Sequence, residues 1–363
     1  MSQISDLRSF RGEWSVTTLQ KDCIVNPTNE KIADKFVYVD LESVKQGQLY
    51  KYQILTKDNA PSRAQRVLHT DDILFQCVRP YQMNNYMVKG TMSDIQWVAS
   101  TGYAQIRTQT DYPAFLYYVL NTSKYNKAVM VRCTGSSYPA INSEDLSKIP
   151  FYKCGIAEQK KIADFLSLLD ERIATQNKVI DKLQSLIKGI AQKIVHSNKP
   201  NVRLSECLEC KSSTLQESEV CEQGTYPVYG ANGIVGYLDN YNTESEAVYI
   251  IKDGSGVGTV SYVTGKCSAT GTLNTLQAKE GYSLQYFYYL LKVFNFEPYK
   301  TGMAIPHIYF KDYGKAKVFC PSYTEQLQYA RLLSAIESNL SIEMNILTNL
   351  SLQKQYLLRQ MFI

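Results

Sequence analysis

The chain has few of the residues that most catalytic sites require. Its 363 residues include only three histidines, His69, His196 and His307, which lie far apart with no neighbouring acid–base pattern. We find no nucleophile elbow, zinc-protease helix or kinase signature, and the nearest approach to an amino-methyltransferase loop, Asn26-Pro27-Thr28, lacks the required continuation. We therefore expect no catalytic apparatus and no metal site on this chain.

Long apolar runs are also missing. Nowhere do 18 apolar residues follow one another, and the polar start, Met1 to Asp6, lacks the charged-then-apolar signature of a signal peptide. With 44% hydrophobic and 20% charged residues, the composition is that of an ordinary globular protein. We expect a cytoplasmic protein without a membrane segment.

The cysteine pattern does not favour a metal site either. Of nine cysteines, only Cys207 and Cys210 form a CxxC pair. Cys221 and Cys267 are possible further ligands, but no second pair or His-x3-His follows, so we favour reduced and mostly buried thiols over structural zinc.

A glycine-rich stretch does not match a phosphate-binding loop. It runs from Tyr226 to Tyr237 and is followed by a second glycine-rich segment, Lys252 to Thr259. A phosphate loop needs Gly-Lys-Ser/Thr entering a helix, whereas Gly258-Thr259 continues as a strand-like run. Hairpin turns are the better interpretation.

What the chain does contain is a second copy of part of itself. The segment 134–194 reappears 167 positions later as 301–361, without a gap. Upstream the similarity is weaker and needs small gaps, as between 115–120 and 286–291. A repeat of this length indicates duplicated architecture.

Each copy ends in a long predicted helix with a heptad seam. From Ala157 to about Val195, apolar residues recur in alternating steps of four and three, and the second copy repeats the pattern. The seam positions are Ile162, Leu166, Leu169, Ile173, Ile180, Leu183 and Ile187 in the first helix, and Leu333, Ile336, Leu340, Leu347 and Leu350 in the second.

Each seam has one central polar residue, Gln176 or Glu343. Such a residue fixes the register of the helix pair if it is buried. It could also be exposed to solvent, at a point where the apolar stripe turns away from the contact. Antiparallel pairing of the two helices would align these two positions and give approximate two-fold symmetry. An intermolecular coiled coil is the competing interpretation.

The segments before the helices are predicted to be mixed α/β units with strand-rich cores. Expected strands include 35–39, 49–55, 73–78, 129–133 and 247–251, and expected aromatic helices cover 111–121 and 284–293. The fold class is α+β. The predicted parts are domain 1 (1–145), a central spacer helix (146–198), domain 2 (199–316) and a C-terminal spacer helix (317–363).

Charge and tyrosine content permit nucleic-acid binding without requiring it. The net charge is +5, and residues 146–198 have nine basic and five acidic groups. Tyrosine is the common aromatic residue, with 28 copies against 12 Phe and 2 Trp. Its ring can stack on bases, but it equally fills half-exposed sheet faces.

The order of several motifs within this repeat is similar to one known family. In the second half these are 226–237, Asp253 to Thr259, Thr301-Gly302 through Pro306-His307-Ile308, and Pro321 with Glu325-Gln326. In the first half they are Asp72 to Phe75 with Val78-Arg79-Pro80, Thr134-Gly135 to Ile141, and Glu158-Gln159. The chain resembles the DNA-specificity subunits of type I restriction-modification enzymes over essentially its whole length. It departs at Cys154, which aligns with Pro321, and at Lys354, which aligns with Ile187.

The resemblance implies a subunit with two target-recognition domains, each reading one half of a bipartite site in double-stranded DNA. It also implies partners: two modification (methyltransferase) subunits docked on the helices, and restriction/translocase subunits. S-adenosylmethionine and ATP/Mg would belong to those partners, and no cofactor is expected on this chain. The alternative is a non-catalytic coiled-coil scaffold that joins two protein-binding modules.

The candidate DNA-binding residues are turn and loop groups that can donate to phosphates or bases. An ordinary solvated surface role remains an alternative for each. They are Arg63, Arg66, Arg79, Lys89 and Tyr138 in the first domain, and Tyr229, Asn232, Lys252, Lys266 and His307 in the second.

Overall fold

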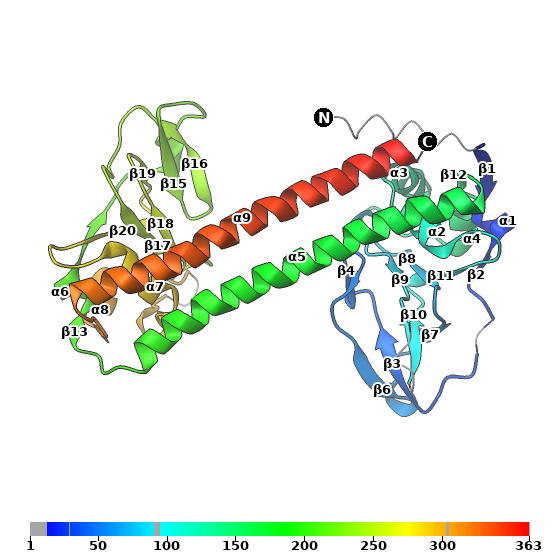
Figure 1. Cartoon of the computed structure of the whole chain (residues 1–363), viewed down its shortest axis with the longest axis horizontal. Helices are drawn as coiled ribbons and strands as arrows, with labels where there is room; N and C mark the ends of the chain where they lie inside the picture. Colours follow the sequence, from blue (N-terminus) through cyan, green and yellow to red (C-terminus); the bar gives the residue numbers. More distant parts are fainter. Residues whose placement is uncertain (1–12, 29, 91–94, 303–304, 363) are drawn as a thin grey trace. The chain divides into compact units, whose positions relative to one another are not determined.

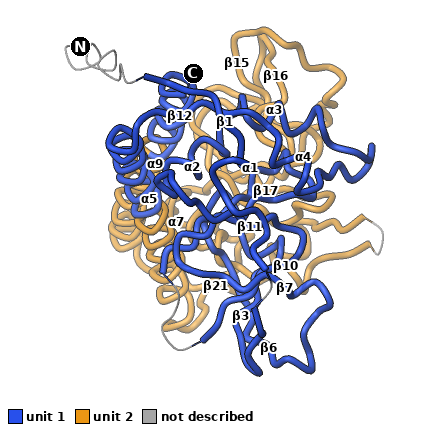
Figure 2. The backbone as a smooth tube through the Cα atoms, turned by 90° about the vertical axis from the view of Figure 1, so that its right-hand side faces the viewer, with its two compact units in different colours: residues 1–175, 347–363 blue, residues 176–346 orange. Residues whose placement is uncertain are grey.

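The computed structural model describes residues 13–28, 30–90, 95–302 and 305–362. The chain forms two compact units (Figure 2). Unit 1 comprises Met1–Thr175 with Leu347–Ile363, and unit 2 comprises Gln176–Ile346. The long helices α5 (Ile156–His196) and α9 (Tyr323–Met361) are therefore divided between the units, so that each unit contains one strand-rich domain and part of both helices.

Unit 1 contains two four-stranded sheets, with strand orders β2-β11-β8-β9 and β6-β3-β10-β7 (Figure 1). Its strands are β1 (Ser15–Thr18), β2 (Cys23–Val25), β3 (Lys35–Val39), β4 (Val44–Lys45), β5 (Gln48–Leu49), β6 (Gln53–Thr56), β7 (Ala64–Leu68), β8 (Ile73–Gln76), β9 (Tyr86–Met87), β10 (Gln96–Ser100), β11 (Tyr103–Thr108) and β12 (Pro150–Lys153). Its helices before α5 are α1 (Leu19–Asp22), α2 (Pro113–Leu120), α3 (Ser123–Arg132) and α4 (Ser143–Ser147), with short 3-10 turns at Lys57–Asn59 and Pro80–Gln82.

Unit 2 repeats this design with sheets β14-β20-β17-β18 and β16-β15-β19. Its strands are β13 (Val202–Arg203), β14 (Leu208–Ser212), β15 (Tyr226–Gly230), β16 (Gly233–Leu238), β17 (Ala247–Ile251), β18 (Val260–Val263), β19 (Ser268–Ala269), β20 (Leu273–Ala278) and β21 (Lys317–Val318). Its helices before α9 are α6 (Leu204–Cys207), α7 (Leu284–Lys292) and α8 (Phe310–Tyr313), with 3-10 turns at Glu217–Glu219 and Glu297–Tyr299. The parallel pair β3/β10 in unit 1 corresponds to the parallel pair β15/β19 here. The prediction of two strand-rich α+β domains is confirmed.

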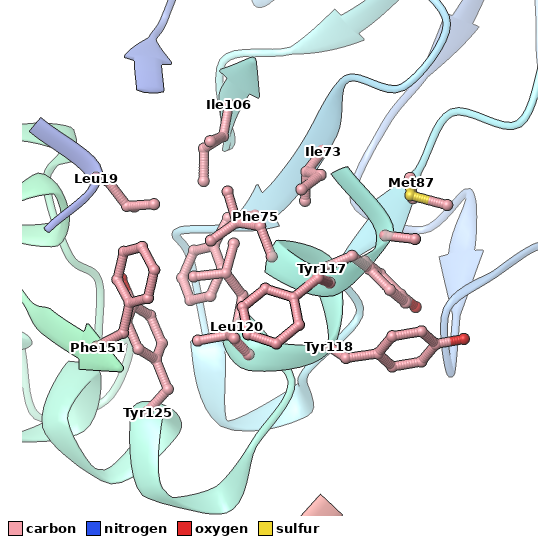
Figure 3. Close-up of a cluster of buried hydrophobic side chains, with 14 of the residues drawn as sticks. Leu19, Ile73, Phe75, Met87, Ile106, Tyr117, Tyr118, Leu120, Tyr125 and Phe151 are labelled. Atoms are coloured by element: carbon pink, nitrogen blue, oxygen red, sulfur yellow. The ribbon is translucent and has the colours of Figure 1, made fainter. Parts of the chain in front are cut away.

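The core of unit 1 lies between its first sheet and the aromatic helix α2. Figure 3 shows Tyr117, Tyr118 and Leu120 of α2 beside Phe75 and Ile106 of the sheet. Most of α2 is buried, and the equivalent helix α7 of unit 2 is buried in the same way. This burial explains why apolar and aromatic residues make up most of both helices.

A buried glutamine joins each aromatic helix to the adjacent long helix. Gln159 accepts a hydrogen bond from the Tyr112 amide at 2.8 Å and donates to the Cys154 carbonyl at 2.9 Å. Gln326, 167 positions later, accepts from the Ser283 amide at 2.9 Å and donates to the Pro321 carbonyl at 2.9 Å. These bonds give a physical role to the repeated Glu-Gln motif at the start of both long helices.

The two long helices pair antiparallel within each unit. In unit 1, Asp170 of α5 forms an ion pair with Lys354 of α9 at 2.5 Å, and the earlier residue Ile162 packs in the same cluster as Met361. In unit 2, Gln176 donates to the carbonyl of Glu343 at 3.1 Å and also to its carboxylate. These two polar residues are equivalent positions of the repeat, and within unit 2 they contact each other across the helix pair.

The seam positions chosen from sequence all lie at buried or half-buried places in the structure. Lys354 enters the seam because Asp170, on the facing helix, supplies a carboxylate for its ammonium group. At the aligned position in α5, Ile187 is buried in the apolar cluster of unit 2. The departure of Lys354 from the repeat is thus compensated by a specific ionic contact.

One expected strand was wrong. Residues 129–133 were expected to be extended, but α3 continues through Arg132. The Thr122 side chain caps this helix by accepting from the Tyr125 amide, and Tyr125 and Val129, one turn apart, are both buried. The local β-branched sequence is therefore overridden by a helix cap and by burial of one helical face. The expected strand 49–55 is also interrupted: it forms two separate strands, β5 and β6.

The cysteines agree with the expected thiol state. All nine are free, and five of them are buried: Cys23, Cys154, Cys207, Cys267 and Cys320. The glycine-rich stretch forms the antiparallel hairpin of β15 and β16, as predicted. Among the described residues, no helix has the length and apolarity needed to cross a membrane.

Candidate nucleic-acid interface

Each unit contains a short loop closed by the same pair of backbone hydrogen bonds, which we call the Thr-Gly loop: 134–140 in unit 1 and 301–307 in unit 2. Two backbone hydrogen bonds of 2.8–2.9 Å join the first and last residues of each loop, Thr134 with Ala140 and Thr301 with His307. The second residue of each, Gly135 or Gly302, has φ +88°. A Cβ on Gly302 would lie 2.3 Å from the Ile305 carbonyl oxygen, so only glycine fits there. Residues 303–304, inside the second loop, lie outside the described residues.

Both Thr-Gly loops are attached to the end of a central sheet strand. After β8, the Arg79 amide donates to the Pro139 carbonyl at 2.8 Å. After β17, the Gly254 amide donates to the Pro306 carbonyl at 3.0 Å, and the Lys252 carbonyl accepts from the Ile308 amide at 2.9 Å. The predicted residues Arg79 and Lys252 are thereby placed beside the two loops.

An exposed ring next to a cation lies in the first loop and just after the second. Tyr138 and Ile305 are equivalent positions of the repeat, and each is 65% exposed. The Arg79 guanidinium lies 4.6 Å from the centre of the Tyr138 ring. In unit 2, the His307 ring packs edge-on against Tyr309, and the Lys311 ammonium lies 5.1 Å from the centre of that tyrosine ring. A cation stacked on an exposed ring can contact both a phosphate and a sugar or base.

The other predicted residues of unit 1 are not in contact with this pair. Arg63 is exposed just before β7, and Lys89 is exposed after β9. Arg66, on β7, is half-buried; burial lowers the pKa of its guanidinium, and its Nε has no hydrogen-bond partner among the described atoms. Arg79 and Tyr138 are thus the two candidates of unit 1 that the structure brings together.

The predicted residues of unit 2 are divided between the loop and the hairpin sheet. Lys252 and His307 belong to the Thr-Gly loop region, whereas Asn232 is exposed at the β15–β16 turn. Tyr229 is half-buried with its ring centre 5.7 Å from that of Tyr249, and burial raises the pKa of its hydroxyl. Lys266 is exposed, with its ammonium 4.7 Å from the Tyr241 ring centre.

Several exposed aromatic residues beside cations were missed from sequence. Tyr241 is one, and Tyr50 is another: it is 70% exposed, with the Lys45 ammonium 4.6 Å from its ring centre. The abundance of tyrosine was the available signal, but it did not distinguish rings at the surface from those in the core. Among the described residues, no group of three or more His, Cys, Asp or Glu side chains is arranged to hold a metal ion.

These features define a class of protein in which two similar strand-rich domains with basic, aromatic loops are each joined to an antiparallel pair of helices. The family model described as the type I restriction modification DNA specificity domain matches residues 24–185 and again residues 197–352. The chain belongs to this family, and it is a DNA-recognition subunit of the type I restriction-modification class.

Individual relatives and solved structures agree with the family. A Mycoplasma genitalium protein named as a type I specificity subunit is 25% identical over 273 residues, which are 68% of this chain and 70% of that protein. A specificity subunit of the Escherichia coli type I enzyme EcoprrI is 26% identical over 117 residues, 32% of this chain and 29% of its own length.

Two solved structures share the fold. A crystal structure of the type I S subunit from M. genitalium aligns with a TM-score of 0.68 at 18% identity and covers 97% of both chains. A second structure, from work on complex assembly and conformational transition of a type I system, aligns with a TM-score of 0.56 at 19% identity, again over 97% of both chains.

Proposed function

We propose that this chain is a non-catalytic subunit in which each unit reads one half of a bipartite site in double-stranded DNA. The observation that carries the proposal is that the specificity-domain family matches twice, with one match for each strand-rich domain and its helix. Two similar readers within one chain suit a target made of two short half-sites.

The repeated Thr-Gly loops are suited to contact the sugar-phosphate backbone, which is the same in both half-sites. The two closing backbone hydrogen bonds and the glycine φ of +88° are the same in both units, whereas a different base sequence would need different side chains. The sugar-phosphate backbone is common to every sequence and is contacted by cations and by exposed amide and hydroxyl groups. We therefore assign Arg79, Tyr138, Lys252 and His307 to contacts that position the duplex.

The helices are proposed to dock two modification subunits. Phe165 on α5 and Leu332 on α9 are equivalent positions of the repeat and are 45% and 50% exposed. In unit 1, Leu168 is also 65% exposed, and in unit 2, Leu186 is 48% exposed. An exposed apolar residue at the same position of both copies of the repeat, Phe165 in one and Leu332 in the other, fits two copies of one partner.

The same proposal assigns the cofactors to the partners. S-adenosylmethionine would bind the modification subunits and ATP with Mg would bind the restriction/translocase subunits, so the present chain needs neither. The DNA that the complex would act on, chromosomal or invading, lies in the cytoplasm, so we expect this chain to act there.

The experiment is methylome sequencing of a host that expresses the modification subunit with and without this chain. The proposal expects a bipartite methylated motif that appears only when the chain is present. The isolated chain should also bind duplex DNA with an affinity that falls steeply with salt, because phosphate neutralisation releases counterions. An absence of both results would favour the protein-binding scaffold, and methylation by the isolated chain would contradict the non-catalytic assignment.

The docking patches are tested by Phe165→Glu and Leu332→Glu. A carboxylate at the centre of an apolar contact disfavours binding, so each variant should reduce the stoichiometry from two modification subunits to one. Native mass spectrometry measures this, with Val131→Glu as control because Val131 is 84% exposed on α3, outside the helix pair. Retention of two partners by both variants would show that these patches do not dock them.

A further inference from the structure

Unit 2 contains a polar groove of about 710 Å³ that includes none of the sequence-predicted residues. One side is formed by residues 211–216, which begin at the end of β14, and the other by Asn240–Asn242, which follow β16. Ser268 of β19 and Thr275 of β20 also line it. The groove therefore lies where the two sheets of the unit meet.

The walls of the groove are held by hydrogen bonds within the protein. The Asn242 amide donates to the Ser213 hydroxyl at 3.1 Å and to the Ala269 carbonyl at 3.0 Å, and it accepts from the Ala269 amide at 2.9 Å. The Leu215 carbonyl accepts from the Gly271 amide at 2.8 Å. A surface held in this way loses little conformational entropy when a ligand binds.

Other polar side chains in the groove have no partner. Within the described part of the chain, the side chains of Ser212, Thr214 and Asn240 make no hydrogen bond, and Asn240 is exposed. An asparagine amide can donate one hydrogen bond and accept another at the same time. It therefore complements the adenine edge in the major groove, which presents one acceptor and one donor. The lining has only two charged residues, Lys211 and Glu219, so it is a poor site for phosphate alone.

A cation and two rings flank the same groove. Tyr241, which lines it, has the Lys266 ammonium 4.7 Å from its ring centre and the Tyr226 ring 5.2 Å away. Lys266 is exposed and can reach a phosphate while the neutral groups face the bases. This arrangement places an exposed cation beside neutral groups that can form hydrogen bonds.

The groove is built from a part of unit 2 that departs from the repeat. The segment between β14 and β15 is 213–225, whereas the corresponding segment of unit 1, between β2 and β3, is only 26–34. The Thr-Gly loops, in contrast, keep the same closing hydrogen bonds and the same glycine φ in both units. If the two units read different half-sites, the parts that contact bases should be parts that differ between the units.

We propose that this groove reads base edges in the half-site bound by unit 2, with the Asn240 amide as a specificity-determining group on one wall and Thr214 on the other. The proposal rests on the proposed function, since it needs the chain to bind DNA as part of a modification complex.

The test is to map the DNA motif that is methylated by complexes containing the variant Asn240→Ala or the near-isosteric variant Thr214→Val. In Asn240→Ala, loss of one bidentate contact should reduce discrimination at one base pair by about 5- to 150-fold, and Thr214→Val should reduce discrimination in the same half-site only. The control is Asn345→Ala, an exposed asparagine on α9 outside the groove, which should leave the motif unchanged. Assembly with the modification subunit, measured on the same preparations, shows that each variant folds.

The outcomes separate the two proposals. If both groove variants assemble and methylate the parental motif with parental stringency, or if the change falls in the other half-site, the groove assignment is wrong while the proposed function stands. If Asn240→Ala fails to assemble, Thr214→Val decides by the same criterion. If the parental complex methylates no motif, the proposed function fails and the groove assignment with it.

Discussion

At the scale of single residues, Asp72 of unit 1 is a charged group whose side chain is fully buried. It accepts from Arg107 Nε at 2.8 Å and Nη2 at 2.9 Å, from Gln105 at 2.7 Å and from the His69 amide at 2.8 Å. Asp72→Ala leaves these donors unpaired and should lower the free energy of unfolding by about 3–5 kcal/mol. Chemical denaturation measures this, with Glu42→Ala as the control because the Glu42–Lys51 ion pair is exposed. Equal effects of the two substitutions would contradict the account.

Glu337 gives a residue-scale prediction about pH. Burial opposes its charge, but hydrogen bonds from Tyr289, Lys292 and Tyr288 outweigh burial and lower the pKa of the carboxyl. Because the pKa is lower in the folded than in the unfolded protein, this stabilisation is present above about pH 4.3 and is lost as the pH falls further. Glu337→Gln should therefore be less stable than the parent at pH 7 and approach it below pH 4 in denaturation experiments. A stability difference independent of pH would refute this role.

Sequence reasoning identified some of these residues but not their partners. Gln159 and Gln326 were visible as a repeated motif, and Arg79 and Tyr138 were both selected, yet their contact could not be foreseen. The Tyr118–Asp170 hydrogen bond of 2.8 Å joins residues 52 positions apart. Such pairings depend on how helices dock, which single-residue chemistry does not determine.

At the scale of elements, periodicity predicted the long helices well and short segments poorly. The first helix was expected from Ala157 to about Val195 and runs from Ile156 to His196, because its apolar spacing persists over many turns. Residues 129–133 were misassigned because a short β-branched run gives way to a capped helix with buried residues one turn apart.

Variants of the Lys354–Asp170 ion pair test whether this contact couples helices α5 and α9. Its side chains are 25% and 15% exposed, and Asp170 also accepts from the Tyr118 hydroxyl. Lys354→Met keeps the apolar stem but removes the cation, and should cost about 1–3 kcal/mol. In a double-mutant cycle with Asp170→Asn, the double variant should lose less stability than the sum of the two single variants. Strict additivity would show that the ion pair does not couple the helices.

At the scale of the whole molecule, the internal repeat was the most informative feature of the sequence. It predicted two related domains and two helices, because the seam and the Thr-Gly motif recur at a constant offset of 167. It could not show that each compact unit takes part of both helices. It also missed the polar groove of unit 2, whose lining comes from several segments separated in sequence.

The central claim is that the two units specify their half-sites independently, and domain replacement tests it most directly. Residues 1–145 would be replaced by the corresponding domain of another family member, and the methylated motif of the hybrid complex would be mapped by methylome sequencing. The account predicts that one half-site changes while the other half-site and the spacer between them stay the same, because domain 2 and both helices are unaltered. A change in both half-sites at once would contradict it.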